Sequence, residues 1–283
     1  MNPFAILKSA IRAALPANDI AYDADLKRYT YNGKRFTTYM RARRYYNALN
    51  QVNLTSWVPG GGDEGFTVAF TGGGSVSGVA DTSPKTVSGV ALGSPSAARE
   101  VFLAVAGFGS GTISSSNDAL AVTIGGVAAD LVVNRLFSNT FAAIYRASVP
   151  TGTSGDVVLD YSAGSTAYDL QAAGVAAYRV TGAAAVLPNT DQIAGNVNSM
   201  GHNVDVSEGG AAIVAQMALN ASQGLNWTIG VTEDYEVDID ADDLASFASA
   251  TELSAEVNKT ITSNTPDGAN IKSAVTVAID AAA

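Results

Sequence analysis

Apolar and polar residues alternate in short runs over most of the chain, and this period of two predicts β-strands. Residues 101–106 differ, because they form a continuous apolar run that is typical of a strand buried on both faces. Clusters of glycine, proline and serine separate the runs and indicate turns. We therefore predict a mainly β fold, an antiparallel β-sandwich of jelly-roll or immunoglobulin-like type. The predicted strands are 66–71, 85–92, 101–106, 121–124, 127–133, 140–148, 156–161, 172–181, 211–220, 227–232, 235–239 and 271–278.

Two dipeptides predict tight hairpins. Gly125-Gly126 separates two β-branched runs, and Asn32-Gly33 is a preferred sequence for a type I′ turn. The polar segments 19–25 and 189–203 are interpreted as loops. A two-residue turn determines which residues face each other across its hairpin. The expected pairs are Ile124 with Val127, Thr123 with Ala128, Val122 with Ala129, Tyr31 with Lys34, Thr30 with Arg35 and Tyr29 with Phe36.

The N-terminal part is predicted to be a separate small module that combines helix, hairpin and helix. Asn2-Pro3 is a good helix start, since a capping side chain is followed by proline at the first helical position. A second apolar stripe at helical spacing follows the Asn-Gly hairpin, over residues 37–52. Proline and three glycines then end any regular element. The expected organisation is a docking module at 1–58, a linker at 59–65 and a β-sandwich domain at 66–283.

Charge divides the chain in the same way. Of 283 residues only 15% are charged, and the formal net charge is −10. Residues 1–50 hold nine Lys and Arg against three Asp, a balance of +6, whereas residues 51–283 hold seven against 23 Asp and Glu, a balance of −16. We expect the basic module to dock on a partner and the acidic domain to face solvent.

The candidate docking residues combine apolar side chains, aromatic rings and arginines. Such a mixture also occurs in segments that bind nucleic acid, where cations neutralise phosphates and rings stack on bases. The acidic domain would repel a polyanion, so we expect a protein partner and not nucleic acid.

No apolar run approaches the roughly 20 residues that span a bilayer, and the first residues lack the pattern of a signal peptide, so we expect no membrane association. The candidate residues for docking on a protein partner are Phe4, Leu7, Ile11, Arg28, Tyr29, Tyr31, Arg35, Phe36, Arg41, Arg44 and Tyr45.

Catalytic side chains are scarce. The chain has no cysteine, which excludes disulfide and thiolate chemistry. Its single histidine, His202, falls in a polar segment and is interpreted as an ordinary loop residue. No Gly-x-Ser-x-Gly motif or phosphate-binding loop accompanies it. We therefore expect a protein that is not an enzyme and needs no cofactor.

The acidic run 233–243 is the one candidate for a metal site. Asp238, Asp240 and Asp242 have the spacing that begins a calcium loop, but Asp243 stands where that loop needs glycine. A solvated strand face, with alternate acidic residues on one side, or an acidic loop is therefore the preferred interpretation. A glycosidase-type carboxylate pair stays open, because spacing in the sequence does not give the separation of the two groups.

Several phrases resemble a module found in structural proteins of tailed bacteriophages and gene-transfer particles. The resemblance covers roughly residues 97–283 and implies a role at the virion surface or tail, with no catalytic residues. The phrases are Val101-Phe-Leu-Ala-Val-Ala106, Ala121-Val-Thr-Ile-Gly-Gly-Val-Ala-Ala129, Ala142-Ala-Ile-Tyr-Arg-Ala-Ser-Val-Pro-Thr-Gly152, Gly155-Asp-Val-Val-Leu159, Ala211-Ala-Ile-Val-Ala215 and Leu225-Asn-Trp-Thr228.

We accordingly expect a virion structural protein, assembled in the host cytoplasm and docked on capsid, neck or tail proteins. Capsid cement or decoration and a neck or tail accessory both suit this interpretation, with a homo-oligomer on the particle. The alternative is a receptor- or carbohydrate-binding spike or tail-fibre protein that recognises a cell-surface glycan.

Overall fold

The computed structural model describes residues 20–23, 28–31, 34–36, 65–81, 84–110, 121–160, 169–184, 189–221, 224–240, 242–265 and 270–282. The chain divides into two units, Met1–Gly62 and Asp63–Ala283, which are described separately. The regular elements of the described residues are all strands, and their sheets are antiparallel. The prediction of a mainly β, antiparallel protein is therefore confirmed.

The N-terminal unit contributes a three-stranded sheet of order β1-β2-β3, formed by Ile20–Asp23, Arg28–Tyr31 and Lys34–Phe36. The predicted hairpin register is confirmed, with Tyr29 opposite Phe36 and Thr30 opposite Arg35. The interpretation of 19–25 as loop was wrong for β1, because the second edge of β2 supplies backbone partners that local polarity does not reveal. The predicted helices and most of the 59–65 linker lie outside the described residues, so the domain boundaries stay predictions.

The larger unit carries the remaining strands. The first half comprises β4 (Thr67–Asp81), β5 (Lys85–Ala91), β6 (Glu100–Ser110), β7 (Ala121–Ile124), β8 (Val127–Phe137), β9 (Thr140–Ser148), β10 (Ser154–Asp160) and β11 (Asp169–Thr181). The second half comprises β12 (Asn189–Val197), β13 (Ser199–Val206), β14 (Gly210–Ala218), β15 (Asn226–Ile229), β16 (Thr232–Asp240), β17 (Asp243–Leu253), β18 (Glu256–Asn264) and β19 (Asn270–Ile279).

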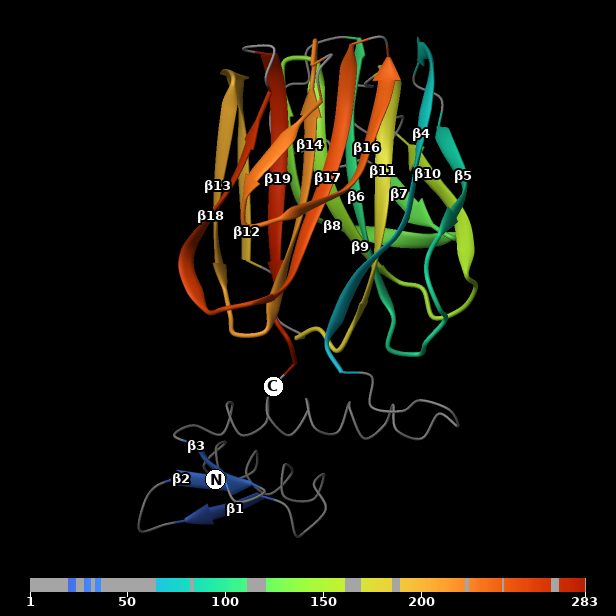
Figure 1. Cartoon of the computed structure of the whole chain (residues 1–283). Helices are drawn as coiled ribbons and strands as arrows, with labels where there is room; N and C mark the ends of the chain where they lie inside the picture. The colour runs from blue at the N-terminus through green and yellow to red at the C-terminus, as the bar shows by residue number, and fades with distance from the viewer. Residues whose placement is uncertain are drawn as a thin grey trace, which may run out of the picture. The chain divides into compact units, whose positions relative to one another are not determined.

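The two halves repeat the same strand pairing. The first half forms an 8-stranded sheet of order β4-β11-β6-β9-β8-β7-β10-β5. The second half forms a 5-stranded sheet, β12-β19-β14-β17-β16, and a 3-stranded sheet, β13-β18-β15. Adding eight to the strand numbers of a pair in the first half gives a pair in the second half, so that β4-β11 corresponds to β12-β19. The exception is the β7–β8 pair, whose counterpart is missing among the described residues. We call the halves the first and second repeat; Figure 1 shows the first in cyan to yellow and the second in orange to red.

The repeats stack as four layers with three apolar cores between them. The 8-stranded sheet folds over at β8, so that β5, β10 and β7 cover one face of β11, β6 and β9. The opposite face of β11, β6 and β9 packs on β14, β17 and β19 of the second repeat. The sheet β13-β18-β15 covers the remaining face of β14 and β19. The two middle layers are thus buried on both faces, as predicted for residues 101–106, which are at most 1% exposed.

The core between the repeats is the largest of these clusters. It takes alternate residues of β6, such as Phe102 and Ala104, and alternate residues of β14, such as Ile213 and Ala215. Side-chain hydrogen bonds also cross between the repeats. The Thr140 and Ser273 hydroxyls lie 2.7 Å apart, the Tyr178 hydroxyl donates to Asp234 at 3.0 Å, and the Gln171 amide donates to Asp240 at 3.3 Å. The two repeats therefore share an apolar core and cross-repeat hydrogen bonds in addition to their covalent connection.

Every strand predicted for residues 66–283, here called the body, corresponds to an observed strand. The Gly125-Gly126 hairpin has the expected register. Both glycines have positive φ, 58° and 81°, as a type I′ turn requires. The interpretation of 189–203 as loop was wrong, because β12 and β13 occupy it. The strands β17 and β18 were not predicted. These four strands are rich in Asn, Ser, Thr and Asp, which depress the apolar alternation on which strand prediction depends.

Arg99 closes the loops at one end of the first repeat. The side chain is 0% exposed and precedes the fully buried part of β6. Its Nε donates to the carbonyl oxygen of Val149 at 2.6 Å, and Nη2 donates to that of Thr151 at 2.7 Å. Its Nη1 donates to the carbonyl oxygens of Leu92 and Gly93 at 3.1 and 2.8 Å. One guanidinium thus satisfies backbone acceptors of two loops.

Replacing this guanidinium should be costly. Arg99→Met keeps a long apolar stem but leaves several buried carbonyls without a donor, so we expect the free energy of unfolding to fall by about 3 to 5 kcal/mol. Urea unfolding of the full chain measures the loss. Arg179→Met is the matched control, because Arg179 donates to Ser94 in an exposed contact, and it should cost less than about 1 kcal/mol. Equal losses would contradict the role given to Arg99.

Close approach of the repeats depends on Gly174 in β11. A Cβ at this position would lie 2.7 Å from Cβ of Ala245 and 2.9 Å from Cγ1 of Val237, both in the second repeat. We expect Gly174→Ala to lower the free energy of unfolding by about 1 to 3 kcal/mol, since the middle sheets must separate. Gly201→Ala serves as control, because a Cβ there meets nothing within 4 Å. Thermal unfolding measures the stability of both variants. A Gly174→Ala variant as stable as the wild type would contradict the requirement for close approach of the repeats at Gly174.

Candidate functional site

The acidic run forms the exposed edge of the 5-stranded sheet. Residues 232–240 are strand β16, which pairs only with β17 among the described residues. The predicted strand is therefore present, and it is an edge strand. Edge strands often carry charged side chains, which discourage pairing with other chains. This location accounts for part of the acidic composition.

Two bulges divide the acidic side chains between different neighbours. The register of β16 against β17 shifts between Glu233 and Tyr235 and again between Asp238 and Asp240. Asp234 consequently accepts a hydrogen bond from the Tyr178 hydroxyl of the first repeat. Glu236 instead accepts one from the backbone N–H of Leu225, at 2.8 Å. The expectation that alternate acidic residues share one solvated face was wrong, because bulges break the period of two.

Tyr235 anchors β16 to the first repeat. Its ring stacks between Phe70 and Phe247, with centroid distances of 6.1 and 6.2 Å and interplanar angles of 19° and 12°. Gly73 provides the space, since a Cβ there would lie 2.5 Å from atoms of the Tyr235 ring. The stack spans both repeats, with Phe70 on β4 and Phe247 on β17. The acidic edge is therefore held in a defined place.

The carboxylates of β16 are partly desolvated and have no cation close by. Burial raises the pKa of Glu233, Asp234 and Glu236. Hydrogen bonds oppose this rise: Ser246 donates to Glu233, Ser249 and Tyr178 donate to Asp234, and the backbone N–H of Leu225 donates to Glu236. The charges of Glu233 and Asp238 add to the rise at Glu236. No Lys or Arg of the described residues forms an ion pair with these three groups. The edge therefore carries like charges that repel one another at neutral pH.

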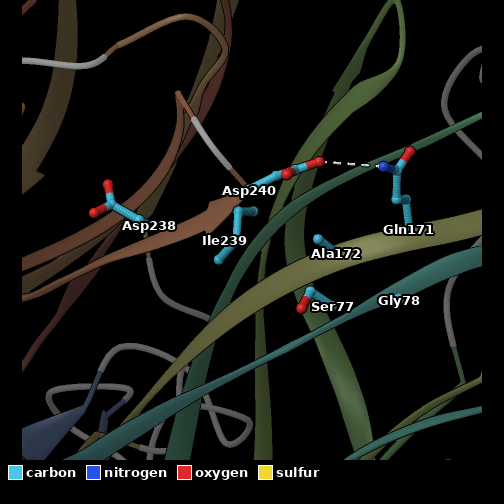
Figure 2. A pocket seen from close by; sticks show the side chains of 7 residues that line it. All are labelled: Ser77, Gly78, Gln171, Ala172, Asp238, Ile239 and Asp240. Atoms are coloured by element: carbon cyan, nitrogen blue, oxygen red, sulfur yellow. Dashed lines mark hydrogen bonds between the residues drawn. The ribbon is translucent and has the colours of Figure 1, made fainter.

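A polar cleft lies where the end of β16 meets β4 and β11. Its volume is about 370 Å³, and Figure 2 shows Asp240 turned toward Gln171 while Asp238 points away from both. The Gln171 amide donates to the Asp240 carboxylate at 3.3 Å. Hydroxyl, amide and carboxylate groups at one opening can exchange hydrogen bonds with a polyhydroxylated ligand. The lining residues are Ser77, Gly78, Gln171, Ala172, Asp238, Ile239 and Asp240.

The three calcium candidates do not converge. Asp238 and Asp240 line this cleft but diverge in Figure 2, and the exposed Asp242 does not line it. In the described part of the chain, no group of three or more histidine and acidic side chains is arranged to hold a metal ion. The register of β16 against β17 shifts between Asp238 and Asp240, and the two side chains point in different directions.

The predicted docking residues fall into two groups. Arg28, Tyr29, Tyr31, Arg35 and Phe36 belong to the paired strands β2 and β3. The others lie outside the described residues: Phe4, Leu7, Ile11, Arg41, Arg44 and Tyr45. Their role as an attachment surface stays a prediction.

His202 is not the loop residue that the sequence suggested. It lies in β13 opposite Ile261, and its side chain is 0% exposed. Burial lowers the pKa of His202 to about 4, and the nearby charge of Asp191 opposes this. An alternation of buried residues was the available signal, since Met200, His202 and Val204 all face inward. The polar histidine at an inward-facing position concealed it, because it interrupts the apolar half of the alternation.

The raised carboxyl pKa values predict an unusual response to acid. A carboxyl group whose pKa is higher in the folded state binds its proton first in that state, so its contribution to stability grows as the pH falls from neutral. Glu236→Gln keeps an acceptor for Leu225 and removes the repulsion from Glu233. We expect it to raise the free energy of unfolding at pH 7.5 by a few tenths to about 1 kcal/mol, and by less at pH 4.5.

Urea unfolding at both pH values tests this expectation. Asp130→Asn, on the exposed part of β8, is the control for removing one acidic charge from the body. A loss of stability in Glu236→Gln at pH 7.5 would mean that the charge itself is stabilising, contrary to the account above.

Comparison with known proteins supplies no relative for this chain. The part of the chain that the structure describes contains no helix long and apolar enough to cross a membrane. No family model matches the chain, and no significant match was found among curated proteins or solved structures.

Proposed function

We propose that the protein is a non-enzymatic structural component of a tailed-phage virion. Residues 1–58 attach it to capsid, neck or tail proteins, and the body is displayed outward as cement, decoration or accessory. The observation that carries this proposal is the repeated eight-strand pairing of the body, in which sheets β4-β11-β6-β9 and β5-β10-β7-β8 face each other in the first repeat. We assign this order to a jelly roll, an architecture used by viral capsid and lectin domains.

The phrases that resemble phage structural proteins support the same proposal. In the first repeat they form β6, the β7–β8 hairpin, β9 and the turn that leads into β10. Four of the six phrases thus lie in the first repeat, and the other two lie at β14 and β15 of the second. A fold can host unrelated functions, so the proposal also depends on the charge division between the basic segment and the acidic body.

A cell-surface glycan is the second candidate ligand, on the strength of the polar cleft beside β16. Its amide, hydroxyl and carboxylate groups are those that recognise sugar hydroxyls. Glycan-array binding by the full chain that is lost in Gln171→Ala would favour a receptor-binding spike or fibre over a cement protein.

Attachment should depend on arginines of residues 1–58, the basic segment. We expect the combined replacement of Arg28, Arg35, Arg41 and Arg44 with Glu to reduce binding of the full chain to particles at least tenfold and to abolish its sensitivity to salt. Co-sedimentation with particles that lack the protein, at low and high salt, measures this.

The same four positions replaced with Lys are the matched control. Lysine retains the charge, so most of the binding should remain. Normal attachment of the glutamate variant at low salt would refute docking through this segment. Binding of the wild type to nucleic acid instead of to particle proteins would refute it as well.

A further inference from the structure

The outer sheet of the second repeat is attached differently from its counterpart in the first. In the first repeat β7 pairs with β8, so one continuous hydrogen-bonded sheet runs from the outer layer into the middle layer. Among the described residues, β15 pairs only with β18, and β16 only with β17. The sheet β13-β18-β15, here called the outer sheet, therefore has no main-chain ladder to the sheet that it covers.

The interior beneath the outer sheet is small and mixed. Its buried apolar part comprises Val204, Val206 and Ile261 of the outer sheet against Ala212, Val214 and Ala278 of the middle sheet, with Trp227, Val231 and Leu253 partly buried against them. The corresponding core of the first repeat is a much larger apolar cluster that includes Val87, Leu103, Tyr145, Leu159 and Val175. Less apolar area holds the outer sheet, so its separation costs less than that of other layers.

Polar side chains fill the rest of this interior. The Trp227 indole donates to the Ser246 hydroxyl at 2.8 Å, and the Ser263 hydroxyl donates to Gln216. Each of these bonds joins the outer sheet to the middle sheet. Thr276, which faces Val214 in register, belongs to the same interior. These contacts are specific but supply little hydrophobic stabilisation.

His202 is the titratable group in the centre of β13. Neither ring nitrogen has a hydrogen-bond partner among the described protein atoms, and the same holds for Nε2 of Gln216 and Oγ1 of Thr276. A neutral imidazole tolerates such surroundings better than an imidazolium, which needs two acceptors and solvation of its charge. Protonation of His202 therefore disfavours the closed position of the outer sheet.

Charged groups on the neighbouring strands do not remove this conflict. β12 brings Asp191, whose carboxylate accepts the backbone N–H of Asn203 at 2.7 Å and favours a proton on His202. β18 brings Lys259 and Glu256, which pair with each other at 3.0 Å. β19 brings Lys272, whose ammonium donates to the Asn198 carbonyl oxygen at 2.8 Å. The paired strand segment of β14, Gly210–Ala218, has no titratable side chain.

We propose that the outer sheet is an acid-released layer: protonation of His202 favours a state in which β13-β18-β15 has separated from the middle sheet while the first repeat stays folded. The device acts between pH 6.5, where an exposed imidazole is half protonated, and about pH 4, where the buried one is half protonated. The open state binds the proton more readily within this window, so opening grows as pH falls.

Acid acts in the opposite direction on β16. Burial raises the pKa of Glu233 and Glu236, so mild acid neutralises their repulsion and supports the folded middle sheet. Acid therefore loosens the outer sheet and strengthens the edge of the layer beneath it. This opposition makes the expected transition local rather than global.

Hydrogen exchange of the full chain tests the proposal. After correction for the intrinsic pH dependence of exchange, protection of β13 and β18 amides should fall roughly 50-fold between pH 7 and 4.5. Protection in β6 and β9 should change by less than a few-fold. An equal fall in both repeats would indicate global unfolding and overturn the proposal.

Variants at one position isolate the histidine. His202→Leu and His202→Gln remove the titration, so protection of β13 and β18 should become nearly independent of pH in whichever of them folds. Thr276→Val is the matched control, because it removes another buried polar atom without a partner but no titratable group, and it should keep the wild-type pH dependence. A wild-type pH response in both histidine variants would also overturn the proposal.

Discussion

Burial between the two middle sheets is the interaction on which the rest of the body depends. The strands β6, β9 and β11 present one face to β14, β17 and β19, and this contact contains the largest apolar cluster of the described residues. Each middle sheet then has a second apolar face, which requires an outer layer. The stack of four layers follows from this requirement. The contact is close because Gly73 and Gly174 leave space for side chains of the second repeat.

The two outer layers meet the same requirement in different ways. In the first repeat the outer layer continues through β8 into the middle sheet and closes over an apolar core. In the second repeat it is a separate sheet, joined to the middle sheet by side chains over a partly polar interior. The first repeat thus serves as an internal reference for the second. The outer layer of the second repeat has fewer buried apolar residues beneath it than that of the first.

These features suit the proposed role of a displayed virion component. In the described part of the body each face of the two middle sheets is covered by another layer, and the acidic composition disfavours close approach of copies. The proposal assigns attachment to the basic segment, whose net charge is opposite to that of the body. The glycan candidate uses a different surface, the polar cleft at the end of β16, and is compatible with the same display.

Local sequence determined the elements that depend only on neighbouring residues. The apolar run 101–106 identified a strand buried on both faces, and Gly125-Gly126 and Asn32-Gly33 determined the registers of two hairpins. Alternation and turn residues also identified the antiparallel β class, because a period of two has one structural interpretation once turns interrupt it. Asp and Glu in 233–243 located the acidic edge, although not its geometry.

Tertiary structure decided the features that depend on partners distant in sequence. The polar strands β12 and β13 form because β19 and β18 supply backbone partners, which no local pattern reveals. Bulges in β16 direct Asp234 and Glu236 to different neighbours, so alternation could not predict their environments. His202 is buried only because a sheet closes over it. The repetition of strand pairing between the two halves is likewise a property of the tertiary structure.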